Sequence, residues 1–314
     1  MMAETTIQDV VYALTSSPNF QQDGICYAGR ASGLFRSGDG GLTWQNAYAA
    51  LELDVPLTTA AVVVSPNFTV DQYVFAGVSG GILQSADDGQ SWNGVNFPSP
   101  PPFVSTLVVS PNFARDGIVL AGTLEDGVFY SSDRGQRWVS WNFGLLDLSV
   151  LALVISPDFA NDETLFVGTD SGIYRSTNGG RAWRAIDFPM EFAPVISLAL
   201  SPNFVTDGVL FAGTESYGLY RSDDRGQSWI QIGPEKISDA VNSIVLSAEF
   251  ATKADILVML SDTLLISRNG GQDWLPWSDN LTAEHGLTAV VAPHGLDPGA
   301  PLLVGPTAGT ILRL

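Results

Sequence analysis

The sequence has few of the side chains that carry nucleophilic or metal chemistry. Its single cysteine, Cys26, excludes an internal disulfide and a cysteine-based metal cage. Cys26 lies in the apolar run ICYA, which predicts a buried and unreactive thiol. The two histidines, His285 and His294, have neither the H-x-H nor the H-E-x-x-H spacing of a metal site. We therefore expect no metal ion and no cofactor.

Basic residues are also scarce. The 314-residue chain has 14 lysines and arginines against 33 acids, which gives a formal charge of −19. Nucleic-acid binding depends on cationic side chains that displace counterions, so this charge excludes nucleic acid as a partner and disfavours anionic membrane surfaces. The charge is compatible with a cationic protein or a neutral glycan as the ligand.

Long apolar segments are missing as well. No stretch of about 18 apolar residues occurs, which argues against a transmembrane helix. The first residues, MMAETTIQDV, lack the basic and apolar regions of a signal peptide. We therefore expect no membrane insertion and a cytoplasmic location, or a secreted one if the given sequence is a trimmed chain.

What the sequence does have is repetition. Six octets follow the pattern Ser-x-Asp/Asn-x-Gly-x-x-Trp, and they are SGDGGLTW (37–44), SADDGQSW (85–92), SSDRGQRW (131–138), STNGGRAW (176–183), SDDRGQSW (222–229) and SRNGGQDW (267–274). A second segment, SPNF or a variant, precedes each octet, and its serines are separated by steps of 48, 45, 46, 45 and 46. One further step of 45 reaches Ala292, so we infer seven copies, of which the last is degenerate.

Each copy contains four short segments rich in β-branched and aromatic residues, bounded by Gly, Pro, Asn or Asp. No long segment has a helical period. Four short strands in about 45 residues are typical of a β-propeller blade. We predict one all-β domain, a seven-bladed propeller of four-stranded antiparallel blades, in which the N-terminal residues 2–7 close the last blade. The approximate blades are 8–52, 53–100, 101–146, 147–191, 192–237, 238–283, and 284–314 with 1–7.

The octet pattern resembles the Asp box, or BNR repeat, of sialidases, sortilin-type receptors and family-74 xyloglucanases. It is also similar to the repeat of photosystem II assembly factors. The resemblance covers nearly the whole chain and implies a β-propeller. It implies no single function, because the Asp box is shared by unrelated activities. The likeness to assembly factors implies an assembly or scaffolding role as one version.

The residue types of the octets favour a structural role over a ligand site. Asp, Asn and Ser side chains hydrogen-bond to the backbone of turns, Gly adopts positive φ, and Trp can pack between blades. Two octets have Asn in place of Asp; Asn keeps the turn hydrogen bond, whereas a metal site would lose a charged ligand. The predicted structural residues are Asp39, Trp44, Asp87, Trp92, Asp133, Trp138, Asn178, Trp183, Asp224, Trp229, Asn269 and Trp274.

Loops that differ between copies are better candidates for ligand binding. In a propeller, the loops from the fourth strand to the next first strand, and from the second strand to the third, lie opposite the octets. Here they combine acids with aromatics, which suits sugars or basic peptides. The alternative is a solvated acidic rim whose aromatics pack inward. The predicted ligand-binding residues are Glu125, Asp126, Trp141, Asp170, Glu191, Phe192, Glu215 and Tyr217.

The sequence gives little support for catalysis. A sialidase needs a cluster of arginines, but nearly all arginines lie in or beside the octets and only Arg30 belongs to a ligand-face loop. A glycoside hydrolase needs two carboxyl groups roughly 5–10 Å apart, and the loop acids single out no pair, so we name no catalytic residue. We predict a monomeric, non-catalytic binding or assembly platform for a protein or carbohydrate ligand around the central channel. The alternatives are a glycoside hydrolase acting through a carboxylate pair on that face and a structural module of a larger assembly.

Overall fold

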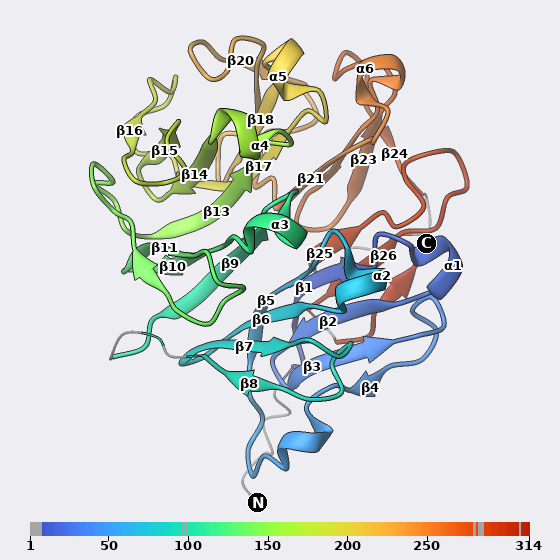
Figure 1. Ribbon diagram of the computed structural model, residues 1–314. Coiled ribbons are helices and arrows are strands. Elements are labelled where there is room, and N and C mark those ends of the chain that lie inside the picture. Colours follow the sequence, from blue (N-terminus) through green and yellow to red (C-terminus); the bar gives the residue numbers. More distant parts are fainter. Residues whose placement is uncertain (1–7, 96, 98–99, 279–280, 282–285, 308) are drawn as a thin grey trace, which may run out of the picture.

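The chain folds into seven β-sheets arranged as a ring, a seven-bladed β-propeller (Figure 1). This computed structural model describes residues 8–95, 97, 100–278, 281, 286–307 and 309–314. Six sheets have four antiparallel strands, and the seventh has three within the described residues. The first strand of each blade lies toward the centre of the ring and the last strand toward the outside (Figure 1). The predicted fold class is confirmed.

The strands follow one another in chain order within each blade. Blade 1 has β1 (Val11–Ser16), β2 (Cys26–Arg30), β3 (Gly33–Ser37) and β4 (Gln45–Asn46). Blade 2 has β5 (Thr59–Val64), β6 (Val74–Val78), β7 (Gly81–Ser85) and β8 (Asn93–Gly94). Blade 3 has β9 (Phe103–Val109), β10 (Val119–Leu124), β11 (Gly127–Ser131) and β12 (Val139–Ser140). Blade 4 has β13 (Val150–Ile155), β14 (Leu165–Thr169), β15 (Gly172–Ser176) and β16 (Arg184–Ala185).

The remaining blades repeat this order. Blade 5 has β17 (Val195–Leu200), β18 (Leu210–Thr214), β19 (Leu219–Ser222) and β20 (Ile230–Ile232). Blade 6 has β21 (Ser243–Leu246), β22 (Ile256–Met259), β23 (Leu264–Ser267) and β24 (Leu275–Pro276). Blade 7 has β25 (Leu287–Val291), β26 (Leu303–Pro306) and β27 (Leu312–Arg313).

A single helical turn at the SPNF segment joins the first and second strands in each of blades 1 to 6. Ser17 shows the reason: its hydroxyl accepts a hydrogen bond from the Asn19 N–H (3.0 Å) and donates one to Asp23 Oδ2 (2.6 Å), which closes the turn. The turns are α1 (Phe20–Asp23), α2 (Phe68–Asp71), α3 (Phe113–Asp116), α4 (Phe159–Asp162), α5 (Phe204–Asp207) and α6 (Phe250–Lys253), and a 3-10 turn, η1 (Ala49–Leu51), follows β4.

The outermost strands are short. For example, β16 has only two residues. The residue before β16 contacts the preceding blade: the indole of Trp183 donates a hydrogen bond to the carbonyl of Trp141 in blade 3 (2.7 Å). Trp92 donates in the same way to the carbonyl of Ala47 (2.9 Å). These hydrogen bonds join each tryptophan to the preceding blade.

Hydrogen bonds between first strands close the ring. Thr288 of blade 7 donates from its hydroxyl to the Val11 carbonyl of blade 1 (2.5 Å). The same kind of bond joins Ser105 to the Val150 carbonyl and Ser197 to the Val241 carbonyl, both at 2.6 Å. The predicted closing strand, residues 2–7, lies outside the described residues.

The blades approach one another closely at a glycine in the second strand. A Cβ added to Gly168 would lie 2.3 Å from the Val195 carbonyl oxygen of the next blade. At Gly122 the nearest atom would be a Val150 methyl at 2.5 Å, and at Gly305 a Val11 methyl at 2.5 Å. Only a residue without a side chain fits there, so these glycines set the spacing of the ring.

Gly168→Ala should therefore destabilise the fold, because overpacking a well-packed contact costs about 1–3 kcal/mol. The free energy of unfolding in guanidinium chloride measures the effect. Gly94→Ala is the matched control: Gly94 also lies in a strand, but its added Cβ would meet nothing closer than a Leu83 methyl at 4.0 Å. Equal stability of the two variants would contradict the proposed spacing role.

Candidate functional site

The hydrogen bonding divides the molecule into two faces. The backbone N–H of Gly40, in the first octet, donates to the Gly24 carbonyl at the end of α1 (3.0 Å). The same bond joins Arg225 of the fifth octet to Gly208 after α5 (2.9 Å). The octets and the helical turns therefore share one surface, the octet face. The loops from second to third strands, and from the fourth strand to the next blade, form the opposite surface, the loop face.

The octets are stabilised by their own side chains. In the fifth octet, Asp224 Oδ1 accepts hydrogen bonds from the Gln227 N–H (2.9 Å) and the Ser228 N–H (2.8 Å), and Oδ2 accepts one from the Ser228 hydroxyl (2.6 Å). Asn178 and Asn269 use Oδ1 in the same way, accepting the N–H groups of Ala182 and Asp273 at 2.9 Å. A neutral amide thus closes the same turn as a carboxylate.

The octet tryptophans join consecutive blades. Trp229 of blade 5 is 9% exposed and belongs to a core cluster with Phe166 and Ile173 of blade 4. Trp92 of blade 2 packs in the same way with Tyr27 and other residues of blade 1. The tryptophans of the second and fifth octets therefore pack against the preceding blade, as a structural role requires.

Hydrogen bonding also holds the octet carboxylates in their charged form. The bonds to Asp224, above all that from the Ser228 hydroxyl, lower its pKa from 3.8 to about 2. The bonds from Thr43 lower the pKa of Asp39 in the first octet well below its ordinary value. Such carboxylates are poor proton donors at neutral pH, which fits a structural role.

The five predicted acidic residues lie on the loop face. Their carboxylates have no hydrogen-bond or ion-pair partner among the described residues. Glu125 and Asp126 are exposed in the turn between β10 and β11, and Asp170 is exposed in the turn between β14 and β15. Glu191 and Glu215 are exposed on loops joined by a bond from the Glu215 N–H to the Pro194 carbonyl (3.0 Å). No ion pair or side-chain hydrogen bond of the described residues involves any of these five carboxylates.

Trp141 has a different environment from the other predicted ligand-binding residues. Its ring stacks on Tyr130 with centroids 3.7 Å apart, and the guanidinium of Arg181 lies 5.3 Å from its centre. Trp141 therefore packs against the octet of the next blade instead of facing the channel. Arg30, the single arginine expected on the loop face, is also engaged: it lies 3.5 Å from Asp9 and stacks over Phe35.

One loop-face aromatic is exposed where its counterparts are packed. Tyr48, Phe97 and Phe188 each follow a fourth strand, and each contacts the octet tryptophan of the next blade, with ring centroids 5.3–5.4 Å apart. Phe143 has the equivalent place after β12 but is 80% exposed, and Leu145 occupies the core beside Trp183 instead. The repeat register is the signal that identifies Phe143, which was not among the predicted site residues.

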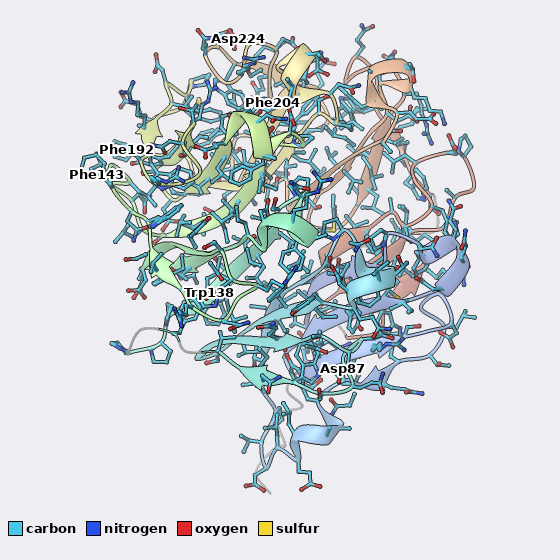
Figure 2. The ribbon with its side chains drawn as sticks, in the orientation of Figure 1. Asp87, Trp138, Phe143, Phe192, Phe204 and Asp224 are labelled. Carbon is cyan, nitrogen blue, oxygen red and sulfur yellow. The ribbon has the colours of Figure 1, made fainter. Side chains whose placement is uncertain are left out.

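Further apolar side chains are exposed on the same stretch of the ring. Leu146 is 86% exposed on the loop that carries Phe143, and Phe192 is 81% exposed on the corresponding loop one blade further. Tyr217, in the turn between β18 and β19, is 39% exposed. Phe143 and Phe192 lie at the outer edge of the ring (Figure 2), not at the central channel where the ligand site was predicted.

Two loop-face carboxylates have several partners among the described residues. Asp9 contacts Arg30 and accepts a hydrogen bond from the Ser32 N–H, and the other is Asp147. Asp147 accepts hydrogen bonds from the Ser149 N–H (3.0 Å) and the Ser171 N–H (2.7 Å), and so ties the loop after β12 to blade 4. Partial burial acts to raise the pKa of Asp147, but the hydrogen bonds, chiefly from Ser171, outweigh it and keep the pKa below its ordinary value. Asp147 anchors the loop that carries Phe143.

Cys26 matches its predicted role. It is fully buried, and burial raises the pKa of its thiol to about 12, so the thiol stays protonated and unreactive. Within the described ranges, no group of three or more His, Cys, Asp or Glu side chains converges as a metal site would require. No helix of the described residues is long and apolar enough to cross a membrane.

The pKa of Asp224 gives a pH test of the octet. Its stabilising contribution should be complete above the ordinary value of 3.8 and should disappear as pH falls to about 2, because only the unfolded chain takes up the proton in that window. Asp224→Asn has no such titration. The difference in unfolding free energy between wild type and Asp224→Asn should shrink from pH 5 to pH 2, as measured by urea unfolding. A difference independent of pH would refute the hydrogen-bond assignment.

Comparisons with known proteins support the propeller fold but assign the chain to no family. No protein-family model matches the chain, and no curated protein matches it. Among solved structures, it is similar to the extracellular domain of a putative one-component system from B. thetaiotaomicron, with 17% identity and a TM-score of 0.73 over 98% of this chain and 38% of that one. A GH74 xyloglucanase from Xanthomonas campestris gives 16% identity and a TM-score of 0.75 over 97% and 52% of the two chains.

A third structure has nearly the same length as this chain. YCF48, solved bound to a D1 peptide, gives 17% identity and a TM-score of 0.72 over 98% of this chain and 94% of that one. The chain spans less than two thirds of the first two structures. At these identities the likenesses show the seven-bladed propeller fold, which is shared by binding proteins and glycoside hydrolases.

Proposed function

We propose that this protein is a non-catalytic binding platform for a protein ligand, which it contacts through exposed apolar side chains on the outer loops of blades 3 to 5. The observation that carries the proposal is the exposure of Phe143. The same position packs against the next blade in three other blades. In blade 3, Leu145 occupies the core position beside Trp183 instead, and the ring of Phe143 stays exposed.

Phe192 supports the same proposal through its backbone. Its φ is 53°, in the left-handed region that a bulky residue rarely adopts. A non-glycine residue there costs on the order of 1 kcal/mol, which buried contacts usually offset. With 81% of its surface exposed, Phe192 has no such offset inside the chain. Strain at an exposed aromatic is typical of contact residues that pack only in a complex.

The chemistry of the surroundings favours a protein over a glycan. Leu146 is an aliphatic side chain and offers no flat surface for a sugar ring, whereas apolar anchors are common in protein interfaces. The unpaired carboxylates of Glu191 and Glu215 lie on the neighbouring loops and would favour a partner with basic residues. The peptide-bound structure of YCF48, a protein of similar fold, supports a peptide as a suitable class of ligand.

The hydrolase alternative has less support. Glycoside hydrolysis requires a carboxyl group that stays protonated beside a second carboxylate. Asp147 is held ionised by its hydrogen bonds and serves as a loop anchor. The similar xyloglucanase is about twice as long, and this chain covers 52% of it.

Phe143→Ser should weaken binding of a ligand that uses this surface. Twelve-residue peptides selected from a random library against the whole protein provide the probes, and isothermal titration measures their affinities. An aromatic anchor contributes about 1.4 kcal/mol or more to the binding free energy, so its loss should raise Kd at least tenfold. Higher salt should also weaken the binding of basic peptides, because salt screens their attraction to the acidic residues of the loop face.

Leu42→Ser is the matched control, since Leu42 is 67% exposed but belongs to the octet face. Its peptide affinities should equal those of the wild type. The proposal fails if Phe143→Ser and Leu42→Ser behave alike. It also fails if β-glucans or xyloglucans are cleaved and Asp or Glu substitutions on the loop face abolish the cleavage without unfolding.

A further inference from the structure

Three blades carry an arginine at the same position, immediately before the octet serine, and one of the three lacks its partner. In blade 1, Arg36 forms a two-pronged ion pair with Asp88, the fourth residue of the next octet. Arg36 Nε lies 2.9 Å from Asp88 Oδ1, and Nη2 contacts Oδ2. The hydroxyl of Tyr27 also donates to Asp88 Oδ1 (2.5 Å). The carboxylate thus fills a position between blades 1 and 2.

In blade 4 the equivalent arginine, Arg175, has no such carboxylate. The fourth residue of the next octet is Arg225, whose φ of 63° matches the 61° of Asp88. The strand residue paired with Arg175 is Phe166, where Arg36 pairs with Tyr27, so the hydroxyl is also missing. On the other side of Arg175 lies Arg184, in the place of a glutamine in blade 1.

The hydrogen bonding of Arg175 is correspondingly incomplete. Its Nε is buried and has no acceptor, and its Nη1 makes one long bond of 3.4 Å to the Arg225 carbonyl. Burial and the charge of Arg225 lower the pKa of Arg175, although an arginine stays charged. Arg221, the third of the set, bonds to Asp223 (2.8 Å) and to the Gly270 carbonyl (2.9 Å). Buried polar groups without partners are rare, so the unpaired Nε of Arg175 needs an explanation.

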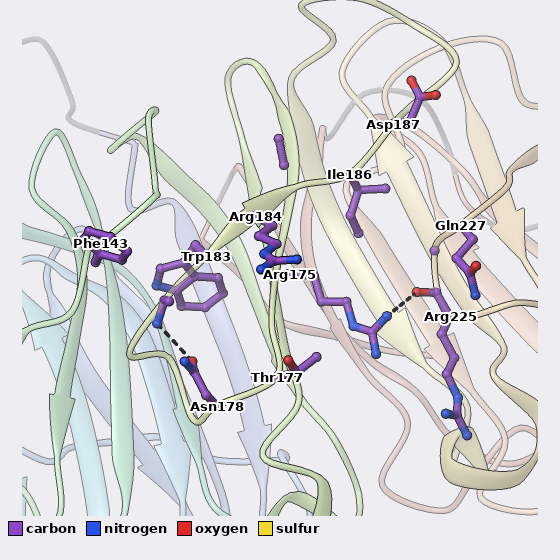
Figure 3. A pocket seen from close by; sticks show the side chains of 13 residues that line it. Phe143, Arg175, Thr177, Asn178, Trp183, Arg184, Ile186, Asp187, Arg225 and Gln227 are labelled. Carbon is purple, nitrogen blue, oxygen red and sulfur yellow. Dashed lines mark hydrogen bonds between the residues drawn. The ribbon is translucent and has the colours of Figure 1, made fainter.

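Arg175 opens onto a groove between the outer parts of blades 4 and 5 (Figure 3). The groove has a volume of about 650 Å³, and its lining includes Arg175, Arg184, Arg225, Ile186 and Asp187. We call it the arginine groove. The guanidinium groups of Arg175 and Arg184 project into it, whereas the carboxylate of Asp187 lies at its far end (Figure 3). The side chain of Arg225 turns away and bonds to the Val205 carbonyl (2.5 Å).

Asp187 lines this groove and the charge of Asp162 acts on Arg175, but neither carboxylate forms an ion pair with the groove arginines. Arg175 and Arg184 are direct cross-strand neighbours on β15 and β16, where like charges are destabilising. In the part of the chain that the structure describes, no ion pair involves either of them or Arg225. This occurs in a chain of formal charge −19, so acids are abundant elsewhere. An anion from outside would relieve the repulsion and supply the missing acceptor.

We propose that the arginine groove binds a carboxylate group of a ligand, held by the guanidinium groups of Arg175 and Arg184 as Asp88 is held by Arg36 in blade 1. A carboxylate is the matching group because its two oxygens fit the planar fork of an arginine. The Arg36 pair shows that this scaffold accommodates that geometry between two blades. Phe143 also lines this groove, but the inference does not rest on the proposed function, because it is argued from the arginine side chains and tested with carboxylates instead of apolar peptides.

Nuclear magnetic resonance of the arginine side chains tests the inference on the whole protein. The probes are glutarate, as a free carboxylate, and N-acetyl-aspartate amide, as an acidic residue of a peptide. Titration with either should move the Nε–H signal of Arg175, which the Arg175→Lys variant identifies by its loss. Arg175→Lys keeps the positive charge but loses the planar guanidinium that holds both carboxylate oxygens. It should weaken binding of the probes at least tenfold, as measured by the shift of the Arg184 Nε–H signal during the titration. The probe that binds more tightly identifies the source of the carboxylate.

The decisive variant is Arg225→Asp, which places an internal carboxylate where blade 2 has Asp88. It should occupy Arg175 and reduce glutarate affinity at least tenfold. Arg134→Asp is the matched control: Arg134 has the same place in the third octet, a φ of 59°, and a similar bond to the Ala114 carbonyl, but Gln84 is in the position equivalent to Arg175. The control should bind glutarate as the wild type does.

Three outcomes would overturn the inference. The first is that the Arg175 signal stays unmoved by both probes. The second is that Arg225→Asp and Arg134→Asp change glutarate affinity equally. The third is that sulfate binds more tightly than glutarate, which would assign the groove to tetrahedral anions instead. If Arg225→Asp does not fold, as judged by circular dichroism, the Arg175→Lys result decides alone.

Discussion

The close approach of consecutive blades is the constraint on which the rest of the structure depends. A propeller has no single central core, so each sheet must bury its faces against its two neighbours. The glycine in the second strand, such as Gly168, brings the inner strands together, and the octet tryptophans fill the outer space between blades. The hydrogen bonds of Asp224 and its counterparts keep the turns that carry those tryptophans in place. The chain repeats this joint around the ring.

A repeated joint also provides an internal reference. When equivalent residues of several blades pack in the same way, a blade in which the equivalent residue packs differently needs another explanation. Phe143 is exposed although Tyr48, Phe97 and Phe188 are packed, and Arg175 lacks a carboxylate although Arg36 has one. Neither departure improves the fold: one exposes an aromatic ring, and the other places arginines together. Both lie in blades 3 to 5, and both leave side chains without the contacts that their counterparts make.

The two surfaces differ in chemistry. The outer loops combine exposed apolar residues with unpaired acids, whereas the arginine groove concentrates positive charge in an otherwise acidic protein. A basic, partly apolar ligand suits the first, and a carboxylate suits the second. Because the propeller joint holds both surfaces on short, well-packed strands, ligand binding would require little ordering of the chain, and less of the interaction energy would be lost to entropy.

The sequence alone determined the fold, since the spacing of the octets and of the SPNF segments counts the blades. Turn residues such as Asp39 act through hydrogen bonds to near neighbours in the chain. The sequence also predicted that Asn178 could replace Asp, for the same local reason. It could not show that Trp141 lies beside Arg181 of the next blade or that Phe143 is exposed. Those outcomes depend on which residues of neighbouring blades meet. The identity of the group facing Arg175, about fifty residues away along the chain, is likewise fixed only when the ring is assembled, because contacts between blades join positions that no local pattern links.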